Sequence, residues 1–169
     1  MTAFREIKPE EIGVNPFRLI GSDWLLITAE NAGKVNTMTA SWGGLGVFWG
    51  KNTAAVVIRP TRYTKEFVDA TGRFSLCVPG DAYRKELQYL GAVSGRDEDK
   101  IAKANLTVLY EDGVPYFAES GLVLFCRSLY AQEMKADCFL DQSLIGRWYP
   151  KLDFHTLYVG EIEKVLTKE

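Results

Sequence analysis

The apolar residues of this chain fall in short runs that are rich in β-branched and aromatic side chains. Runs of this kind, bounded by Gly, Pro, Asn or Asp, are typical of β-strands. The pattern predicts at least six strands, over residues 24–29, 53–60, 73–79, 106–111, 122–134 and 155–166. Residues 30–36, with their Gly and Asn, predict a turn after the first strand, and residues 111–116 predict another turn.

Two short helices are expected beside these strands. One runs from about Arg62 to Ala70 and is followed by Gly72, and the other begins after Asp81, a good N-cap, and ends near Gly91. Because strands and helices do not alternate regularly, the pattern disfavours a doubly wound parallel sheet. A mainly β fold, in which a closed antiparallel barrel carries peripheral helices, fits the pattern better.

The length and composition indicate an ordinary globular protein. The chain has 169 residues, which predicts one domain over residues 1–169 with a sizeable core. It is 47% hydrophobic and 25% charged, with a net charge of −2 and both signs interspersed, so nucleic-acid and membrane-surface roles are disfavoured. No run approaches the roughly 18 apolar residues of a membrane helix, and the first residues lack the apolar core of a signal peptide. We therefore expect a cytoplasmic protein.

The cysteines and the histidine limit the chemistry that the chain can carry. Cys77, Cys126 and Cys138 are three in number and include no C-x-x-C, so we expect reduced and mostly buried thiols. His155 is the only histidine, which excludes a His-rich metal site, and no spacing supports a mixed Cys/His zinc site. No metal is expected.

The common nucleotide and hydrolase motifs are incomplete. Gly44 and Gly46 begin a dinucleotide-binding spacing, but Trp49 stands where its last Gly is required. Gly50 and Lys51 match the Gly-Lys pair of a P-loop motif, but the next residue is Asn52, where the motif requires Ser or Thr. A single histidine and no G-x-S-x-G disfavour a Ser–His–Asp hydrolase.

Two neighbouring segments suggest a polar binding site. Residues 36–50, NTMTASWGGLGVFWG, combine small hydroxyl residues with bulky aromatic ones, which suits neither a buried strand nor a solvent loop. In residues 58–67, IRPTRYTKEF, a predicted helix opens with Arg62 and Lys65, where a cation opposes the helix dipole at a cost of about 0.3–1 kcal/mol. A phosphate bound by backbone N–H groups, the Arg fork and the Thr hydroxyls would reverse that sign. From the residues alone, the alternative is that both cations point to water or pair with acidic residues of the helix.

The whole stretch 36–67 resembles the flavin reductase-like, FMN-binding split-barrel family, which includes flavoredoxin-like proteins. Members carry a similar Asn-x-Met-Thr-x-Ser-Trp segment, followed by a strand and an Arg-Pro-x-Arg-Tyr-Thr helix start. SGRDEDK (94–100) and HTLYVGEI (155–162) match further family segments, so the resemblance covers most of residues 20–162. It implies an antiparallel, Greek-key-like split β-barrel that binds FMN and forms a homodimer.

The resemblance also implies where FMN would bind. The hydroxyl-rich segment would line the flavin, with Trp42 beside its ring system. Arg62 and Thr64 would hold the phosphate, and Lys100 would approach from the later loop. The full implied set of FMN-binding residues is Asn36, Thr39, Ala40, Ser41, Trp42, Arg59, Arg62, Thr64, Lys65 and Lys100.

His155 has two interpretations. A lone histidine at a strand start is more often a structural residue. By resemblance it would stand beside the flavin ring or the incoming nicotinamide, as a cation or a neutral donor that stabilises negative charge, and we therefore predict a catalytic role for it.

The function implied is that of a flavin reductase. Such an FMN-dependent NAD(P)H oxidoreductase would pass reducing equivalents from NADH or NADPH through FMN to a small-molecule or protein acceptor. A flavoredoxin-like electron carrier with a protein redox partner is the alternative, and a flavin-storage protein is a weaker one.

Residues 135–154 depart from the shortest family members. They could cover the flavin, reach a partner subunit or simply pack, with Trp148 and Tyr149 as anchors. These two aromatics, with Phe48 and Trp49, look exposed and are compatible with a dimer interface.

Overall fold

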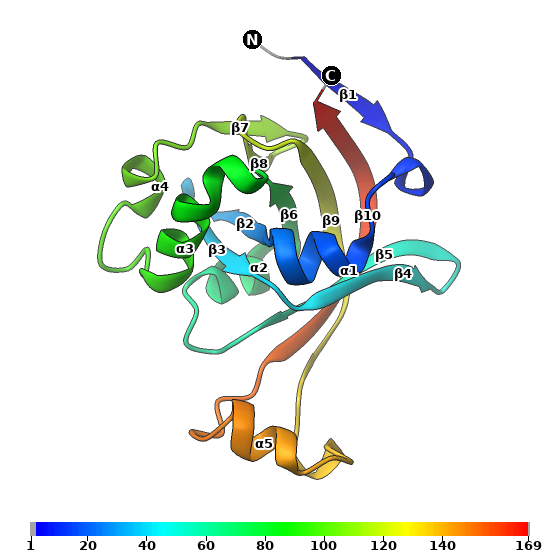
Figure 1. Cartoon of the computed structure of the whole chain (residues 1–169), viewed down its shortest axis with the longest axis vertical. Coiled ribbons are helices and arrows are strands. Elements are labelled where there is room, and N and C mark those ends of the chain that lie inside the picture. Colours follow the sequence, from blue (N-terminus) through cyan, green and yellow to red (C-terminus); the bar gives the residue numbers. More distant parts are fainter. Residues whose placement is uncertain (1–2, 169) are drawn as a thin grey trace.

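One antiparallel sheet of eight strands forms the centre of the structure (Figure 1). The computed structural model describes residues 3–168. The strands are β1 (Phe4–Ile7), β2 (Leu25–Asn31), β3 (Lys34–Ala40), β4 (Gly43–Phe48), β5 (Lys51–Ile58), β6 (Arg73–Val78), β9 (Leu122–Glu133) and β10 (Thr156–Lys168), with β7 (Val108–Glu111) and β8 (Val114–Phe117) in a separate hairpin. The helices are α1 (Pro16–Arg18), α2 (Thr64–Thr71), α3 (Arg84–Ala92), α4 (Lys100–Lys103) and α5 (Ser143–Trp148).

The main sheet does not close into a barrel. Its strands follow the order β3-β2-β6-β9-β10-β5-β4, and no pairing joins β3 to β4 within residues 3–168. The chain nevertheless runs directly from β3 to β4 through Ser41 and Trp42, so these two residues cross the gap between the sheet's edges. The closed barrel expected from the pattern alone is therefore wrong, whereas the split barrel implied by the resemblance is confirmed.

Two apolar layers explain why several strands read as almost continuous apolar runs. In β2, Ile27 belongs to the cluster enclosed by the sheet, together with Phe74 and Tyr158. Its neighbour Leu26 points the other way and packs with Leu87 and other residues of α3 and the β7–β8 hairpin. Successive strand residues face opposite sides of a sheet, so burial on both sides removes the polar alternation that marks a half-exposed strand.

The six predicted strands are present, but four others were not predicted. β1 and β8 are only four residues long, so neither is long enough to show a periodic pattern. β8 begins inside the stretch predicted as a turn, and the actual turn is confined to Asp112 and Gly113. β3 begins within the first predicted turn and contains several polar residues. β4 is glycine-rich and largely exposed. Neither strand therefore shows the apolar run on which the prediction depends.

Helix α2 begins later than the sequence indicates. The backbone N–H of Arg62 donates to the carbonyl of Arg59 at 3.0 Å, which closes a turn before the helix starts at Thr64. Arg62 thus precedes the helix instead of standing in its first turn. The predicted end is confirmed, because Gly72 follows with a φ of 65°, the left-handed conformation that favours glycine. A 3₁₀ turn over residues 81–83 precedes helix α3, which begins at Arg84. The helix ends at Ala92, next to the expected Gly91.

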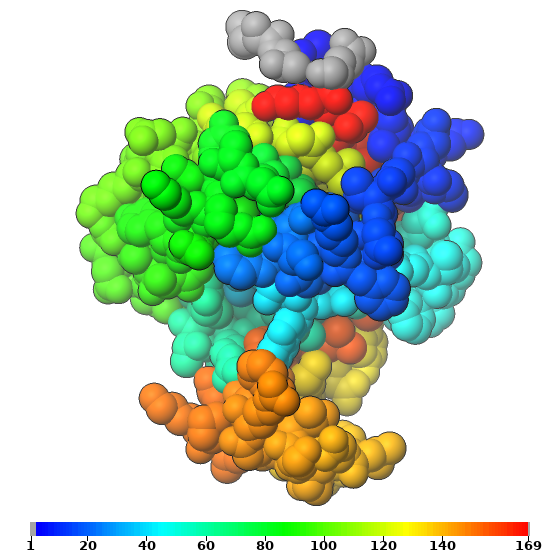
Figure 2. All heavy atoms as spheres, viewed as in Figure 1, coloured from blue at the N-terminus to red at the C-terminus, as the bar shows by residue number. Residues whose placement is uncertain are grey.

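Residues 134–155, which we call the arm, project from the barrel between β9 and β10 (Figures 1 and 2). The arm carries α5, and the rings of Phe139, Tyr149 and Phe154 pack together inside it. Tyr149 is only 4% exposed, so the expectation that it is a surface aromatic is wrong. Trp148 remains partly exposed, as do Phe48 and Trp49 on the β4–β5 hairpin.

Arg59, just beyond β5, ties the arm to the barrel. Its Nη1 lies 2.8 Å from Oδ2 of Asp153, and its Nη2 donates to the carbonyl of Trp148 at 2.7 Å. Its guanidinium also lies over the Tyr149 ring, 4.9 Å from the centroid. These contacts explain how a projecting segment keeps a fixed position.

The structure also tests what the composition indicated about the cysteines and about membrane helices. Cys77 and Cys126 are buried and Cys138 is exposed, and all three are free thiols. Among residues 3–168, no helix combines the length and the apolar character that crossing a membrane requires.

We predict that Gly43→Ala destabilises the fold, because Gly43 begins β4 immediately after the gap. A Cβ there would lie 2.3 Å from the carbonyl oxygen of Ala55, and its φ of +143° is unfavourable for other residues. The free energy of unfolding should fall by about 1–3 kcal/mol in urea denaturation. Gly44→Ala is the matched control, since its Cβ would meet nothing within 4 Å. Equal losses in both variants would contradict this account.

Candidate functional site

A cavity of about 210 Å³ lies at the gap between β3 and β4. Seven of the residues that the sequence singled out line it: Thr39, Ala40, Ser41, Trp42, Arg59, Arg62 and His155. Met38, Val57 and Trp148 complete its wall. Segments that are far apart in the sequence thus meet here, and the arm contributes to the same wall as the hydroxyl-rich segment.

The position of Arg62 is set by the end of α3. Its Nη1 donates to the carbonyl of Gly91 at 3.1 Å, while the hydroxyl of Thr39 donates to the carbonyl of Leu87 at 2.5 Å. Nη2 of Arg62 is buried and has no hydrogen-bond partner within residues 3–168. A buried charged donor without a partner is costly, so this nitrogen favours an anionic ligand.

A second buried cation lies close to Arg62. Lys100 is 3% exposed, and its Nζ donates to the carbonyls of Leu90 and Val93, each at 2.9 Å. Burial, and then the charge of Arg62, lower the pKa of Lys100 to about 8. Neither cation has a carboxylate within ion-pair distance in the part of the chain that the structure describes. The surroundings of Arg62 therefore carry uncompensated positive charge.

His155 contributes a neutral imidazole to the cavity. It is 8% exposed, and its Nδ1 lies 2.7 Å from the hydroxyl of Tyr149. Burial, and then the charge of Arg59, lower the pKa of His155 to about 4. The ring is therefore uncharged near pH 7, which disfavours the cationic role considered from the sequence.

Aromatic rings form the other side of the cavity. Trp42, in the link between β3 and β4, meets Trp148 of the arm edge to face, with centroids 5.0 Å apart and planes at 90°. The centroid of the His155 ring lies 5.2 Å from that of Trp42. A flat apolar ligand would find aromatic contacts here, next to the polar end at Arg62.

Four predicted residues lie outside this cavity wall. Asn36 donates through Nδ2 to the hydroxyl of Thr64 at 2.9 Å, and this buried bond ties β3 to α2. Lys65 forms an ion pair with Asp69, with 2.7 Å between Nζ and Oδ2, and is not among the residues that line the cavity. Lys100 donates hydrogen bonds to two carbonyls at the end of α3. The geometry thus gives Asn36, Thr64, Lys65 and Lys100 structural contacts, whatever else they do.

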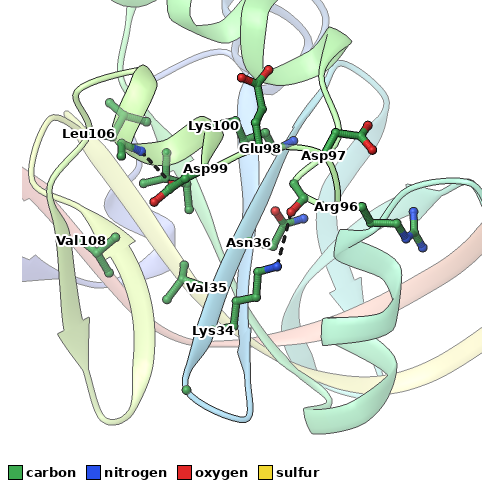
Figure 3. Close-up of a pocket in the computed structure, with 14 residues that line it drawn as sticks. Lys34, Val35, Asn36, Arg96, Asp97, Glu98, Asp99, Lys100, Leu106 and Val108 are labelled. Carbon is green, nitrogen blue, oxygen red and sulfur yellow. Dashed lines mark hydrogen bonds between the residues drawn. The ribbon is translucent and has the colours of Figure 1, made fainter.

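Asn36 and Lys100 instead line a larger cavity of about 540 Å³ (Figure 3). It lies between the start of β3 and the segment formed by residues 95–99 and the start of α4, where Nζ of Lys34 donates to the carbonyl of Gly95 at 3.4 Å. Its charged residues are of both signs, with three consecutive acids at 97–99. Because of these carboxylates, this cavity is less suited to a phosphate than the Arg62 cavity.

Sequence reasoning missed two partners in the site. The sequence indicated Gly91 only as a helix end, and Tyr149 only as an anchor of the 135–154 connection or an interface aromatic. No local signal connects Gly91 to Arg62, because the two residues are 29 positions apart and meet only through packing. Tyr149 lies only 6 positions before His155, but nothing in that spacing indicates that their side chains meet.

Solved structures with a similar fold are known. An FMN-binding domain of a flavin reductases-like enzyme from Shewanella baltica OS155 superposes with a TM-score of 0.70 at 19% identity, covering 98% of this chain and 78% of that chain. A flavoredoxin from Methanosarcina acetivorans gives a TM-score of 0.70 at 24% identity, covering 98% and 76%. At these identities the likeness shows the fold alone.

The sequence comparisons go further. YddH, an uncharacterised protein of Escherichia coli (strain K12), is 32% identical over 112 residues, which are 63% of this chain and 59% of that protein. The chain thus spans less than two thirds of the length of this curated relative. Residues 17–169 match the family described as "Flavin reductase like domain". The chain therefore belongs to the flavin reductase-like family, as the resemblance of its motifs predicted.

Proposed function

We propose that this protein binds FMN in the cavity at the gap between β3 and β4. We further propose that it acts as an FMN-dependent oxidoreductase of the flavin reductase type. It would take reducing equivalents from NADH or NADPH and pass them to a small-molecule or protein acceptor. The observation that carries the proposal is the buried, unpartnered Nη2 of Arg62, next to the hydroxyl-rich end of β3.

The residues present fit FMN. Arg62 would hold the phosphate, and the hydroxyl of Ser41 would lie near it in the same wall. Trp42 would contact the ring system, with His155 as a polar group at the same end. Bound FMN would supply the redox chemistry of the reaction. The chain would supply the binding groups, the orientation and a neutral hydrogen-bond donor.

The size of the cavity suggests that a flavin would extend beyond it. Sites for drug-sized ligands usually enclose about 300–1,000 Å³, more than the cavity at Arg62 offers. A second cavity of about 240 Å³ is lined by Phe17, Ile20 and Gly44 among others, and Ser41 lines both cavities. A ligand as large as FMN would therefore reach along the gap, past Ser41, or against a second subunit.

A homodimer is the second part of the proposal. The β4–β5 hairpin exposes Val47, Phe48 and Trp49, with Trp49 62% exposed, and the arm exposes Leu140 and Leu152. Such apolar side chains on projecting segments are typical of a protein interface. The family resemblance points the same way.

Arg62→Ala should weaken FMN binding by about 1.5–3 kcal/mol, the range for a hydrogen bond to a charged group. Riboflavin, which lacks the phosphate, should bind the parent and the variant almost equally. Both titrations are followed by the quenching of flavin fluorescence. An equal loss for both ligands would mean that Arg62 acts on the structure, and a parent that binds neither ligand would refute the cofactor proposal.

His155→Ala should slow the reduction of bound FMN by NADH or NADPH about 10²–10³-fold, while FMN affinity stays within roughly tenfold. The donor would matter more as negative charge develops on the ring than before. Anaerobic stopped-flow bleaching of the flavin measures the rate. His155→Gln, which keeps an N–H donor, should recover part of it.

Two outcomes of this experiment would count against the proposal. If His155→Ala bleaches as fast as the parent, the imidazole is structural. If the parent itself oxidises neither NADH nor NADPH with any acceptor, yet accepts electrons from a reduced redox protein, the flavoredoxin-like carrier is the better description.

Light scattering at micromolar concentration, with FMN present, should give a mass near twice the 19.0 kDa of one chain. The apolar side chains exposed on the hairpin and the arm are the physical reason. A mass near that of one chain would contradict the dimer.

A further inference from the structure

Tyr149 occupies a fixed position where the arm meets the barrel. It is 4% exposed, and its ring packs against Phe139 and Phe154, with the Arg59 guanidinium above it. Its hydroxyl lies 2.7 Å from Nδ1 of His155. The phenol oxygen is therefore held against one chosen nitrogen of the imidazole.

Within residues 3–168, two acceptors lie within reach of the hydroxyl proton. One is Nδ1 of His155, and the other is the sulfur of Met134, 3.7 Å from the phenol oxygen. A thioether sulfur is a weak acceptor, whereas the bare nitrogen of a neutral imidazole is a good one, and the shorter distance also favours Nδ1. When the hydroxyl donates to Nδ1, the single proton of the neutral ring resides on Nε2.

The surroundings keep the ring neutral, so that the choice between the two nitrogens matters. The charged and titratable groups that face His155 are Arg59, Arg62, Asp153 and Tyr149. The two cations disfavour an imidazolium, and Asp153 favours it but is itself paired with Arg59. A neutral imidazole carries one donor and one acceptor, and a neighbour can decide which is which.

We propose that Tyr149 is a positioning residue that holds the proton of His155 on Nε2, so that the imidazole offers the cavity an N–H donor and not a lone pair. His155 lines the cavity and Tyr149 does not, so the nitrogen left for a ligand is Nε2. The use of this donor toward flavin rests on the proposed function, whereas the position of the proton does not. The arm is in this way part of the site, because it carries the hydroxyl that sets the tautomer.

The chain contains a single histidine, so its imidazole can be observed without assignment. The full-length protein is labelled with ¹⁵N-histidine, and long-range ¹H–¹⁵N spectra are recorded between pH 6 and pH 8. We expect the parent to show the neutral Nε2–H tautomer. In Tyr149→Phe, which keeps the ring and removes the hydroxyl, the ratio of Nε2–H to Nδ1–H should fall about three- to tenfold. Tyr110→Phe, on β7, removes a hydroxyl elsewhere and should leave the spectrum unchanged.

The proposal is overturned if the parent shows the Nδ1–H tautomer, or if Tyr149→Phe leaves the ratio unchanged. Should Tyr149→Phe fail to fold, the parent and Met134→Leu decide the matter. Met134→Leu removes the competing acceptor and should leave the Nε2–H tautomer in place, whereas a change to Nδ1–H would overturn the proposal. The spectra need neither cofactor nor substrate. Failure of FMN to bind would therefore refute the proposed function and leave this result untouched.

Discussion

The gap between β3 and β4 is the constraint on which the rest of the site depends. The register of β3 ends with Ala40 opposite Leu25, and that of β4 begins with Gly43 opposite Val56. Ser41 and Trp42 therefore lie outside both ladders, and their polar groups are not committed to a strand partner. A closed barrel would have used the edges of β3 and β4 for pairing. The open edge leaves room for a ligand beside a rigid sheet.

The last turn of α3 organises the charge beside this gap. Arg62 binds the carbonyl of Gly91, and Lys100 binds those of Leu90 and Val93. The carbonyls at a helix C-terminus carry partial negative charge, which stabilises cations there. One guanidinium nitrogen is nevertheless left over, so the helix holds the positive charge in place without neutralising it. The carbonyls at the end of α3 thus account both for the structural contacts of Lys100 and for the position of Arg62 at the proposed anion site.

The arm connects the periphery of the molecule to the same site. Arg59, which follows β5, holds the arm through its ion pair with Asp153. Tyr149 contacts His155, and Trp148 contacts Trp42. A connection that projects from the fold would ordinarily be mobile. Here its inner face is aromatic and buried, which allows it to fix a catalytic candidate in one orientation. Leu140 and Leu152 of the arm are exposed, as the proposed dimer requires.

The sequence by itself determined the strands with long apolar runs, the end of α2 at Gly72, the family and the grouping of seven candidate residues. These features depend on local composition or on motifs that keep their order in the chain. The tertiary structure decided that the sheet stays open and that Arg62 reaches the carbonyl of Gly91. It also decided that Tyr149 is buried, with the Arg59 guanidinium over its ring. Local patterns specify which segments are strands, but the side chains that meet across a gap depend on long-range packing, in which residues close in space lie far apart in sequence.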